Sequence, residues 1–382
     1  MKRKLPQIIL FLFVCLTNRA YDFGNGGLMY NIIDDETTTN VTEIEVTYVV
    51  QGDENANYYT GDIVIPGAFI KDGTPYKVVG IGVSAFEGCS GLTSVIIPNS
   101  VTTIGARAFR KCSGLTSMEI PNGITSISGF TFSGCSGLTS VIIPNNVTTI
   151  GASAFNGCSS LTSVEIPNSV TTIGASAFNS CSSLTFVKIP NGVTAIQSTA
   201  FYGCNNITSV VSEIEEPFYY GAEAFLNIAP TCTLTIPAGT RDAYIAAGWT
   251  EDVFKGGVVE AIKFADANVK AICVANWDTN EDGELDKNEA ADVTDLGEVF
   301  KENTNITSFD ELQYFTGLTS ISSSALSEQG TFNRCSRLTS VTIPNSVTFI
   351  GNLAFQNCIN LTSVTIPNSV TAIAHGAFFN CI

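Results

Sequence analysis

Histidine and basic residues are scarce in this 382-residue chain. His375 is its one histidine, so every Ser-His-Asp triad, Cys-His pair or histidine-rich zinc site would have to use that single imidazole, and the sequence favours a protein that is not an enzyme. Lys and Arg number 18 against 35 Asp and Glu, and the formal net charge is −17. Because nucleic acids and anionic membranes are bound through Lys and Arg, this charge argues against both as partners.

Long apolar runs are absent as well, since no segment approaches the roughly 20 apolar residues of a transmembrane span. The first residues instead follow the pattern of a secretory signal peptide: residues 2–4 are basic, residues 8–16 are apolar, and cleavage is expected after Ala20. We therefore expect a secreted or cell-surface protein. Lipid attachment at Cys15 is a less favoured alternative, because Val14 stands where a lipoprotein signal has a small residue.

What the chain does have is a repeat of 23 residues. Phe, Pro and Cys recur with this period in two stretches, and a fixed period of 20 to 29 residues is typical of a solenoid in which each repeat forms one coil. The sequence therefore predicts a mainly β fold, a leucine-rich-repeat solenoid of stacked 23-residue coils with a small helical insert. The predicted parts after the signal peptide are an N-terminal β cap (21–62), block 1 (63–210), a capping or linker segment (211–262), an acidic insert (263–312) and block 2 (313–382).

One repeat illustrates the expected coil. The unit that begins at Leu92 has the L-x-x-L-x-L spacing of a leucine-rich repeat, which predicts a strand that ends at Pro98. A second short strand is expected at 101–104. Gly105 is expected to let the backbone turn, and Phe109 to fill the space between the two sides of the coil.

The whole unit, LTSVxIPNSVTxIGxxAFxxC, resembles the repeat of the BspA-like leucine-rich-repeat surface proteins of host-associated bacteria. The resemblance covers Gly80 to about Val210 and Leu318 to Ile382, and residues 233–249 look like the cap that often ends such an array. The resemblance implies a non-catalytic surface adhesin or platform for interaction with host or other cells. Its implied partners are host extracellular or cell-surface proteins.

Nine of the twelve cysteines occupy one equivalent position of the repeat, and they form a ladder along the stack. Adjacent coils would place their Cα atoms about 5 Å apart, which permits disulfides, but side chains in a ladder point the same way and not at each other. Buried free thiols are the favoured interpretation, and metal binding is the least favoured. The ladder consists of Cys89, Cys112, Cys135, Cys158, Cys181, Cys204, Cys335, Cys358 and Cys381.

The acidic insert contains a candidate calcium site. Residues 278–289 match the EF-hand loop D-x-[DN]-x-[DN]-G-x5-E at every defined position, and resemble a lone EF-hand or half of a dockerin-type module. Flanking apolar residues at helical spacing, with Asp266 as a cap, predict a helix on each side. One structural Ca²⁺ is expected, and a solvated acidic loop is the alternative. The expected ligands are Asp278, Asn280, Asp282, Glu284 through its carbonyl, Asp286 and Glu289.

The outward positions of the predicted strands carry mostly Ser and Thr, which suits a plain solubilising surface. Large apolar residues are exceptions among these Ser and Thr positions, and aromatic side chains contribute a large share of the binding energy of protein interfaces. The residues expected to contact a partner are Phe130, Phe186, Phe349, Ile96 and Ile142. Two alternatives stay open: a structural cell-envelope scaffold, or a glycan-binding module without a high-affinity protein partner.

Overall fold

The computed structural model describes residues 23–25, 28–34, 42–47, 59–322 and 330–381, and the predicted signal peptide lies outside them. The described residues divide into two compact units. Unit 1 holds the residues up to Thr208 together with Pro217–Cys232 and Ala247–Lys255. Unit 2 holds Ser209–Glu216, Thr233–Ala246 and the chain from Gly256 onward.

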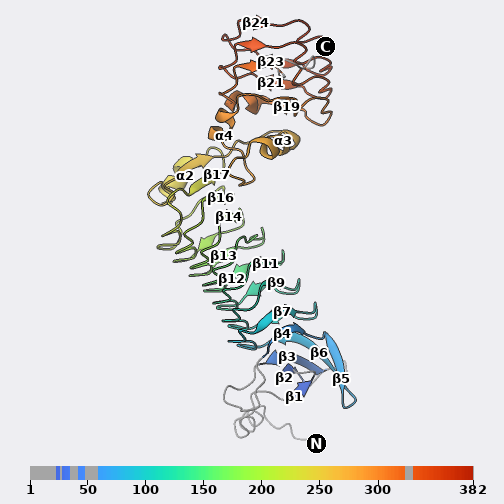
Figure 1. Cartoon of the computed structure of the whole chain (residues 1–382), viewed down its shortest axis with the longest axis vertical. Coiled ribbons are helices and arrows are strands. Elements are labelled where there is room, and N and C mark those ends of the chain that lie inside the picture. The colour runs from blue at the N-terminus through green and yellow to red at the C-terminus, as the bar shows by residue number, and fades with distance from the viewer. Residues whose placement is uncertain (1–22, 26–27, 35–41, 48–58, 323–329, 382) are drawn as a thin grey trace, which may run out of the picture. The chain divides into compact units, whose positions relative to one another are not determined.

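Unit 1 begins with a sheet in the strand order β1-β2-β3-β6-β5 (Figure 1). Its strands are β1 (Phe23–Asn25), β2 (Leu28–Asp34), β3 (Thr42–Thr47), β5 (Ala68–Lys71) and β6 (Thr74–Ile81). Strand β4 (Gly61–Val64) instead pairs in parallel with β7 (Leu92–Ile96), and β6 pairs with β8 (Thr103–Ile104). The boundary expected at residue 62 therefore falls where strands of this sheet and of the first coil alternate along the chain.

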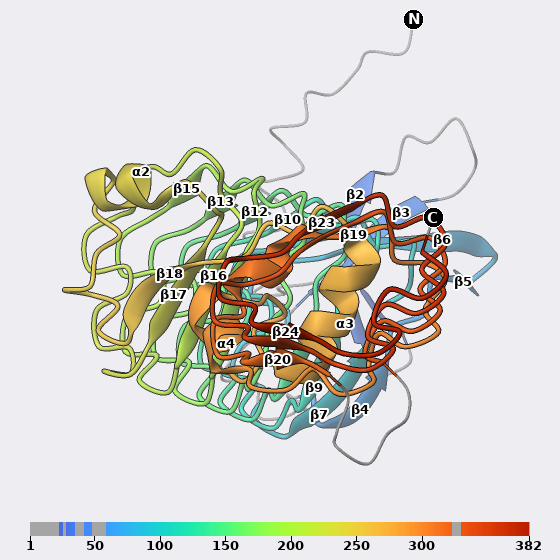
Figure 2. The same ribbon diagram turned by 90° about the horizontal axis from the view of Figure 1, so that it is seen from above.

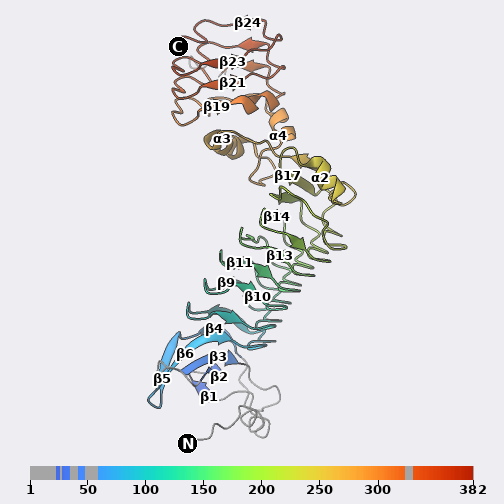
Figure 3. The same ribbon diagram turned by 180° about the vertical axis from the view of Figure 1, so that it is seen from behind.

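The following coils of unit 1 form parallel ladders whose partners are 23 residues apart (Figures 1 and 3). Ser140 pairs with Ser117, for example, and Thr172 with Thr149. The strands on one side are β9 (Ser117–Glu119), β11 (Ser140–Ile142) and β14 (Phe186–Ile189); those on the other are β10 (Ser126–Ile127), β12 (Thr149–Ile150), β13 (Thr172–Ile173) and β15 (Ala195–Ile196). The predicted mainly β character is confirmed.

Stacked phenylalanine rings form the centre of this core. Neighbouring rings from Phe86 to Phe225 have centroids 5.1–5.5 Å apart and planes within 10° of parallel. Their separation follows the spacing of adjacent strands, so each coil adds one ring to the column. Trp249 closes the column, since its ring contacts Phe225 at 5.6 Å and its indole N–H donates to the carbonyl of Phe218 at 2.9 Å.

The repeated glycine has a different role from the one expected. The backbone turns after Gly105, whose carbonyl accepts from the N–H of Ala108 at 3.2 Å, but Gly105 does not adopt a positive φ, so the turn itself does not require glycine. A Cβ at this position would lie 2.5 Å from the backbone nitrogen of Val83, and at Gly151 it would lie 2.6 Å from the carbonyl oxygen of Ile127. Glycine is required because the backbone of the preceding coil passes too close for any side chain.

The cysteine ladder consists of free thiols. None of the eleven cysteines that the structure describes forms a disulfide, and ten of them are buried. Each ladder thiol from the second coil onward donates to the carbonyl of a phenylalanine in the preceding coil, as Cys135 does to Phe109 at 3.0 Å and Cys158 to Phe132 at 3.2 Å. The favoured interpretation therefore agrees with the structure, and the thiols are also hydrogen-bond donors that link adjacent coils.

These buried thiols are expected to be inert in the native protein. Burial raises the pKa of the Cys89 thiol to about 11 and that of Cys135 to about 12, so both stay protonated near pH 8, and the thiolate is the reactive species. Alkylation of the native mature protein at pH 8 should leave the ten buried cysteines unmodified, whereas denaturation should expose them all. Mass spectrometry would count the modified sites, and rapid native modification of several ladder cysteines would contradict this packing.

Unit 2 opens with a parallel sheet of β16 (Ser209–Ser212), β17 (Thr233–Ile236) and β18 (Gly257–Glu260), with helix α2 (Arg241–Ala246) between the last two strands in the chain. Helices α3 (Ala267–Trp277) and α4 (Lys287–Asp292) and the 3₁₀ helix η1 (Asp310–Tyr314) belong to the acidic insert. No helix in the described part of the chain has the length and apolarity that crossing a membrane demands.

A second stack of coils completes unit 2, and its coils superimpose when viewed along the stack (Figure 2). One ladder contains β19 (Ser308–Phe309), β21 (Ser340–Thr342) and β23 (Ser363–Thr365), and the other β20 (Ser320–Ile321), β22 (Phe349–Ile350) and β24 (Ala372–Ile373). Cys273 of α3, Leu285 of the acidic loop and Phe332 of the stack belong to one hydrophobic core. The insert is therefore packed as the first layer of this stack.

Candidate functional site

The helices on both sides of the acidic loop begin at aspartate caps. The Asp266 carboxylate accepts hydrogen bonds from the backbone N–H groups of Asn268 and Val269, and α3 starts at the next residue, as the sequence predicted. Asp286 caps α4 in the same way and forms a reciprocal capping box with Glu289. Because these caps satisfy N–H groups that a helix start leaves unpaired, they set where the two helices begin.

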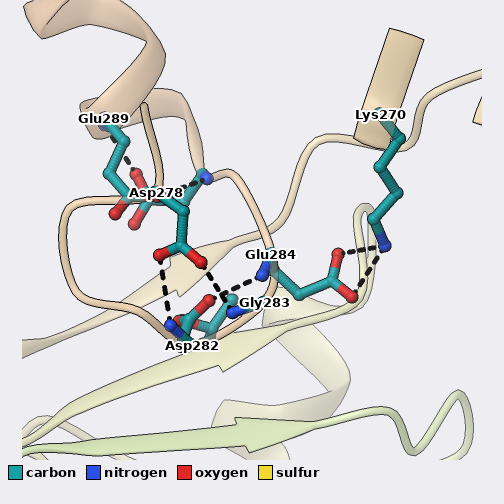
Figure 4. Close-up of polar contacts among 8 residues, drawn as sticks. Lys270, Asp278, Asp282, Gly283, Glu284 and Glu289 are labelled. Carbon is teal, nitrogen blue, oxygen red and sulfur yellow. Dashed lines mark hydrogen bonds and ion pairs between the residues drawn. The ribbon is translucent and has the colours of Figure 1, made fainter. Parts of the chain in front are cut away.

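The turn of the loop is built around Asp278 (Figure 4). Its two carboxylate oxygens accept from the backbone N–H groups of Asp282 at 3.1 Å and Gly283 at 2.8 Å. The side-chain oxygen of Asn280 accepts from the same Asp282 N–H at 2.9 Å. Gly283 has φ +81° with open space around it, so glycine is needed here for its backbone conformation.

Glu289 and Glu284 point in different directions from this turn (Figure 4). One carboxylate oxygen of Glu289 accepts from the N–H of Thr279 at 2.9 Å, and the other accepts from Asp286 at 3.1 Å. The Glu284 carboxylate pairs with Lys270 of α3 at 2.5 Å. The expected ligand atom of Glu284 is its backbone carbonyl oxygen, and the ion pair with Lys270 involves only its side chain.

Two contacts attach the loop to the sheet of unit 2. The Thr235 hydroxyl on β17 donates to the buried carboxylate of Asp282 at 2.8 Å. The carbonyl of Leu285 accepts from the N–H of Ile262 at 2.7 Å, just beyond β18. The sequence pattern did not reveal Thr235, because a hydroxyl 47 residues from its partner leaves no local signal.

Two carboxylates of the loop, those of Asp282 and Glu289, have raised pKa values because they are buried. Burial raises the pKa of Asp282, and the nearby Asp278 charge adds to this effect. Burial likewise raises the pKa of Glu289, with a contribution from Asp286. A bound cation would stabilise both ionised groups.

The turn and the glycine match those of a calcium loop, and the Asp278 oxygens accept one hydrogen bond each and retain a lone pair. Oε1 of Glu289 already accepts from the Thr279 N–H, the Thr279 hydroxyl and the Asn280 N–H. Within the described residues, however, no three His, Cys, Asp or Glu side chains converge closely enough to hold a metal ion. Calcium binding by Asp278, Asn280, Asp282, Glu284, Asp286 and Glu289 therefore remains a prediction.

Replacing Thr235 with valine should destabilise unit 2 by about 1–3 kcal/mol, since it removes a hydrogen bond to a buried carboxylate at nearly constant volume. Serine at this position keeps the hydroxyl and should cost less. Chemical denaturation of the three proteins would measure the difference. Equal stability of the valine and serine variants would show that the hydroxyl contributes nothing.

The outer strand face of block 1 comprises the outward positions on the first strand of each coil. Ile96 and Ile142 are each 62% exposed there, as predicted, and Phe186, at the position equivalent to Ser94 and Ser140, is half-buried. Val64 on β4 is 65% exposed and pairs directly with Ile96, and it extends this apolar set. Val64 was missed because it precedes the stretch where the period is visible. Exposed Glu119 lies between the two isoleucines in the ladder.

Phe130 and Phe349 lie elsewhere. Phe130 is 38% exposed in a turn beyond β10, at φ +61°, with the Arg107 guanidinium 5.5 Å from its ring centroid. A bulky residue in the left-handed region is uncommon, and the equivalent Ser153 has a similar φ. Phe349 is 39% exposed on β22 of unit 2. Neither residue therefore belongs to the outer strand face of block 1.

Comparison with known families explains the repeats. The profile described as BspA type Leucine rich repeat region matches residues 79–208 and 327–382, with six copies. The matched residues lie in the two repeat blocks. The match does not include residues 209–326, where β16 to β18, the acidic loop and η1 lie. The family match therefore accounts for the coils and says nothing about the loop.

Solved structures of other leucine-rich-repeat proteins are similar to this chain. One from Bacteroides ovatus ATCC 8483 is 24% identical over 95% of this chain and 93% of its own, with a TM-score of 0.48. The T. pallidum Leucine Rich Repeat protein is 28% identical over 59% and 95%, also at 0.48. A leucine rich cell surface protein from Faecalibacterium prausnitzii A2-165 is 21% identical over 90% and 94%, at 0.32. No curated protein sequence matches the chain.

Proposed function

We propose that this chain is an exported, non-catalytic protein that binds protein partners at the cell surface or outside the cell. Leucine-rich-repeat proteins generally bind proteins, and the observation that supports a specific surface here is the outer strand face of block 1. Val64, Ile96 and Ile142 are largely exposed there among Ser and Thr. Exposed apolar side chains on a rigid surface are the usual anchors of an interface.

The neighbouring charges indicate what kind of partner would fit. Glu119 and Glu165 are exposed at the position equivalent to the isoleucines, on the coils before and after that of Ile142. A complementary surface would carry apolar side chains with Lys or Arg between them. Host extracellular or cell-surface proteins with such basic, apolar surfaces are the proposed partners.

Replacing Ile96 and Ile142 together with serine should weaken the binding of a partner by about 2 kcal/mol or more and leave the melting temperature nearly unchanged. The partner would first be found by screening the mature protein against extracellular-matrix and plasma proteins. The matched control replaces Ser94 and Ser140 of the same strands with alanine. Full binding by the isoleucine double variant would exclude this face, and loss on Phe130→Ser alone would place the contact at the turn.

Export is supported by the pattern of residues 1–20, and it predicts a mature N-terminus at Tyr21. Sequencing the N-terminus of protein recovered from the medium or the cell surface would test this. An intact N-terminus that begins at Met1 would contradict it.

We propose in addition one structural Ca²⁺ in the loop of residues 278–289. The support is the EF-hand spacing, the caps on both helices and the turn around Asp278. The ion would supply positive charge to the loop carboxylates, which the chain itself pairs with N–H groups and hydroxyls. Its role would be to stabilise the first layer of the second stack.

A further inference from the structure

Unit 2 contains a cavity of about 440 Å³ beside the acidic loop, a size in the usual range for small-molecule sites. Four elements surround it: the turn after β17, the end of β18, the start of α4, and η1. None of the predicted calcium ligands lines it. The polar and aromatic side chains that line it are Glu260, Lys263, Lys287, Asp310, Glu311, Gln313 and Tyr314, the last four on η1.

One part of the lining is already paired. The Lys287 ammonium lies 3.8 Å from the Glu260 carboxylate and 5.1 Å from the centroid of the Tyr314 ring. The other oxygen of Glu260 accepts from the backbone N–H of Gly239 at 2.9 Å. This arrangement holds the Lys287 side chain in place, and the charges of Lys287 and Glu260 balance each other.

The other part has unused hydrogen-bonding capacity. Glu311 is only 8% exposed, and one of its carboxylate oxygens accepts from the Ala265 N–H at 2.8 Å, whereas Oε2 has no hydrogen-bond partner. A buried carboxylate oxygen without a donor is costly. Lys263, exposed at the same cavity, offers N–H donors.

The mixture of charges restricts the chemistry of a ligand. A cationic amine would meet Lys263 and Lys287, and an anion would meet Glu260, Asp310 and Glu311. A metal ion is disfavoured, because Lys263 and Lys287 in the lining would repel it. A neutral ligand with several hydroxyl groups suits the site, since each hydroxyl both donates to a carboxylate and accepts from a lysine or amide.

We propose that this cavity binds a neutral saccharide. Glu311 and Asp310 accept hydrogen bonds from its hydroxyl groups, and Lys263 and Gln313 donate to them.

The surface next to the cavity extends the same chemistry. The two oxygens of Asp310 accept from the hydroxyls of Ser340 at 2.9 Å and Thr342 at 3.0 Å on β21. Ser363 and Thr365 lie in register beside them on β23, exposed. Further sugar units of a longer glycan would meet this row of hydroxyls.

The test uses the full mature protein and the methyl glycosides of glucose, galactose, mannose, fucose, xylose and N-acetylglucosamine. Saturation-transfer NMR should detect at least one, and titration gives its affinity. Lys263→Ala and Glu311→Gln should each weaken that affinity about tenfold or more, as expected for loss of a hydrogen bond to a charged group. Asp292→Asn, an exposed change on α4 outside the cavity, is the control and should leave it unchanged.

Melting temperatures close to that of the parent would show that the variants are folded. If Glu311→Gln is unstable, Lys263→Ala still tests the proposal, because Lys263 is exposed and its replacement should not affect folding. Absence of binding for all six glycosides would overturn the proposal, as would binding that neither variant weakens. Binding of putrescine or inorganic phosphate in place of the glycosides would also overturn it, because the site would then recognise charge.

Discussion

Replacing Phe155 with alanine is expected to lower the free energy of unfolding by about 3–5 kcal/mol, the usual cost of removing a large aromatic side chain from a core. Phe155 is fully buried, with Phe132 and Phe178 each stacked at 5.3 Å on its two sides. The neighbouring coils are held at strand spacing by their backbone ladders, so they cannot collapse into the space. Chemical denaturation with the linear extrapolation would measure the loss.

Phe130→Ser is the matched control, because it removes the same side chain one coil away. Phe130 lies in the turn at a positive φ, and the equivalent residue of the next coil is Ser153 with φ +54°. The loss of its contact with Arg107 should cost no more than about 1 kcal/mol. Similar destabilisation by Phe155→Ala and Phe130→Ser would contradict the central role of the stacked rings.

The fold of the coils could be predicted because it is repeated. The outward position of Ile96 and the inward position of Phe109 both follow from a pattern that occurs in every unit, and the structure confirms both. The role of Gly105 could not be derived from one coil, because the atom that excludes a side chain belongs to Val83 of the preceding coil. The place of Val64 was hidden for a similar reason, since β4 joins the stack from a segment without the period.

The contacts in the candidate sites are likewise of two kinds, local ones and ones between residues far apart in the sequence. The cap at Asp266 could be predicted because it lies within three residues of the N–H groups it satisfies, whereas the equally local cap at Asp286 was not predicted, because Asp286 was assigned to calcium alone. The hydroxyl of Thr235 reaches Asp282 across the fold, and the cavity joins Glu260 to Glu311 from separate elements. Contacts of this kind depend on the packing of α3, α4 and η1, which a motif alone does not determine.

The calcium loop predicts a second large effect. With calcium at 100 times its Kd, the full mature protein should gain about 2.7 kcal/mol of stability, by the mass-action term RT ln(1 + [L]/Kd). Thermal melts in calcium and in a chelator would show the gain as a higher melting temperature of unit 2, and calorimetry should give one ion per chain.

Glu289→Gln should remove most of this gain, because the amide keeps an acceptor for the Thr279 N–H but cannot bind the ion as a bidentate carboxylate. The matched control is Asp292→Asn, which removes one acidic charge from the exposed side of the same helix. It should keep the full response to calcium, since Asp292 lies outside the loop. A calcium response that falls equally in both variants would indicate general charge screening, and absence of any heat at millimolar calcium would exclude the site, because even weak extracellular loops bind at about 10⁻⁴ to 10⁻³ M.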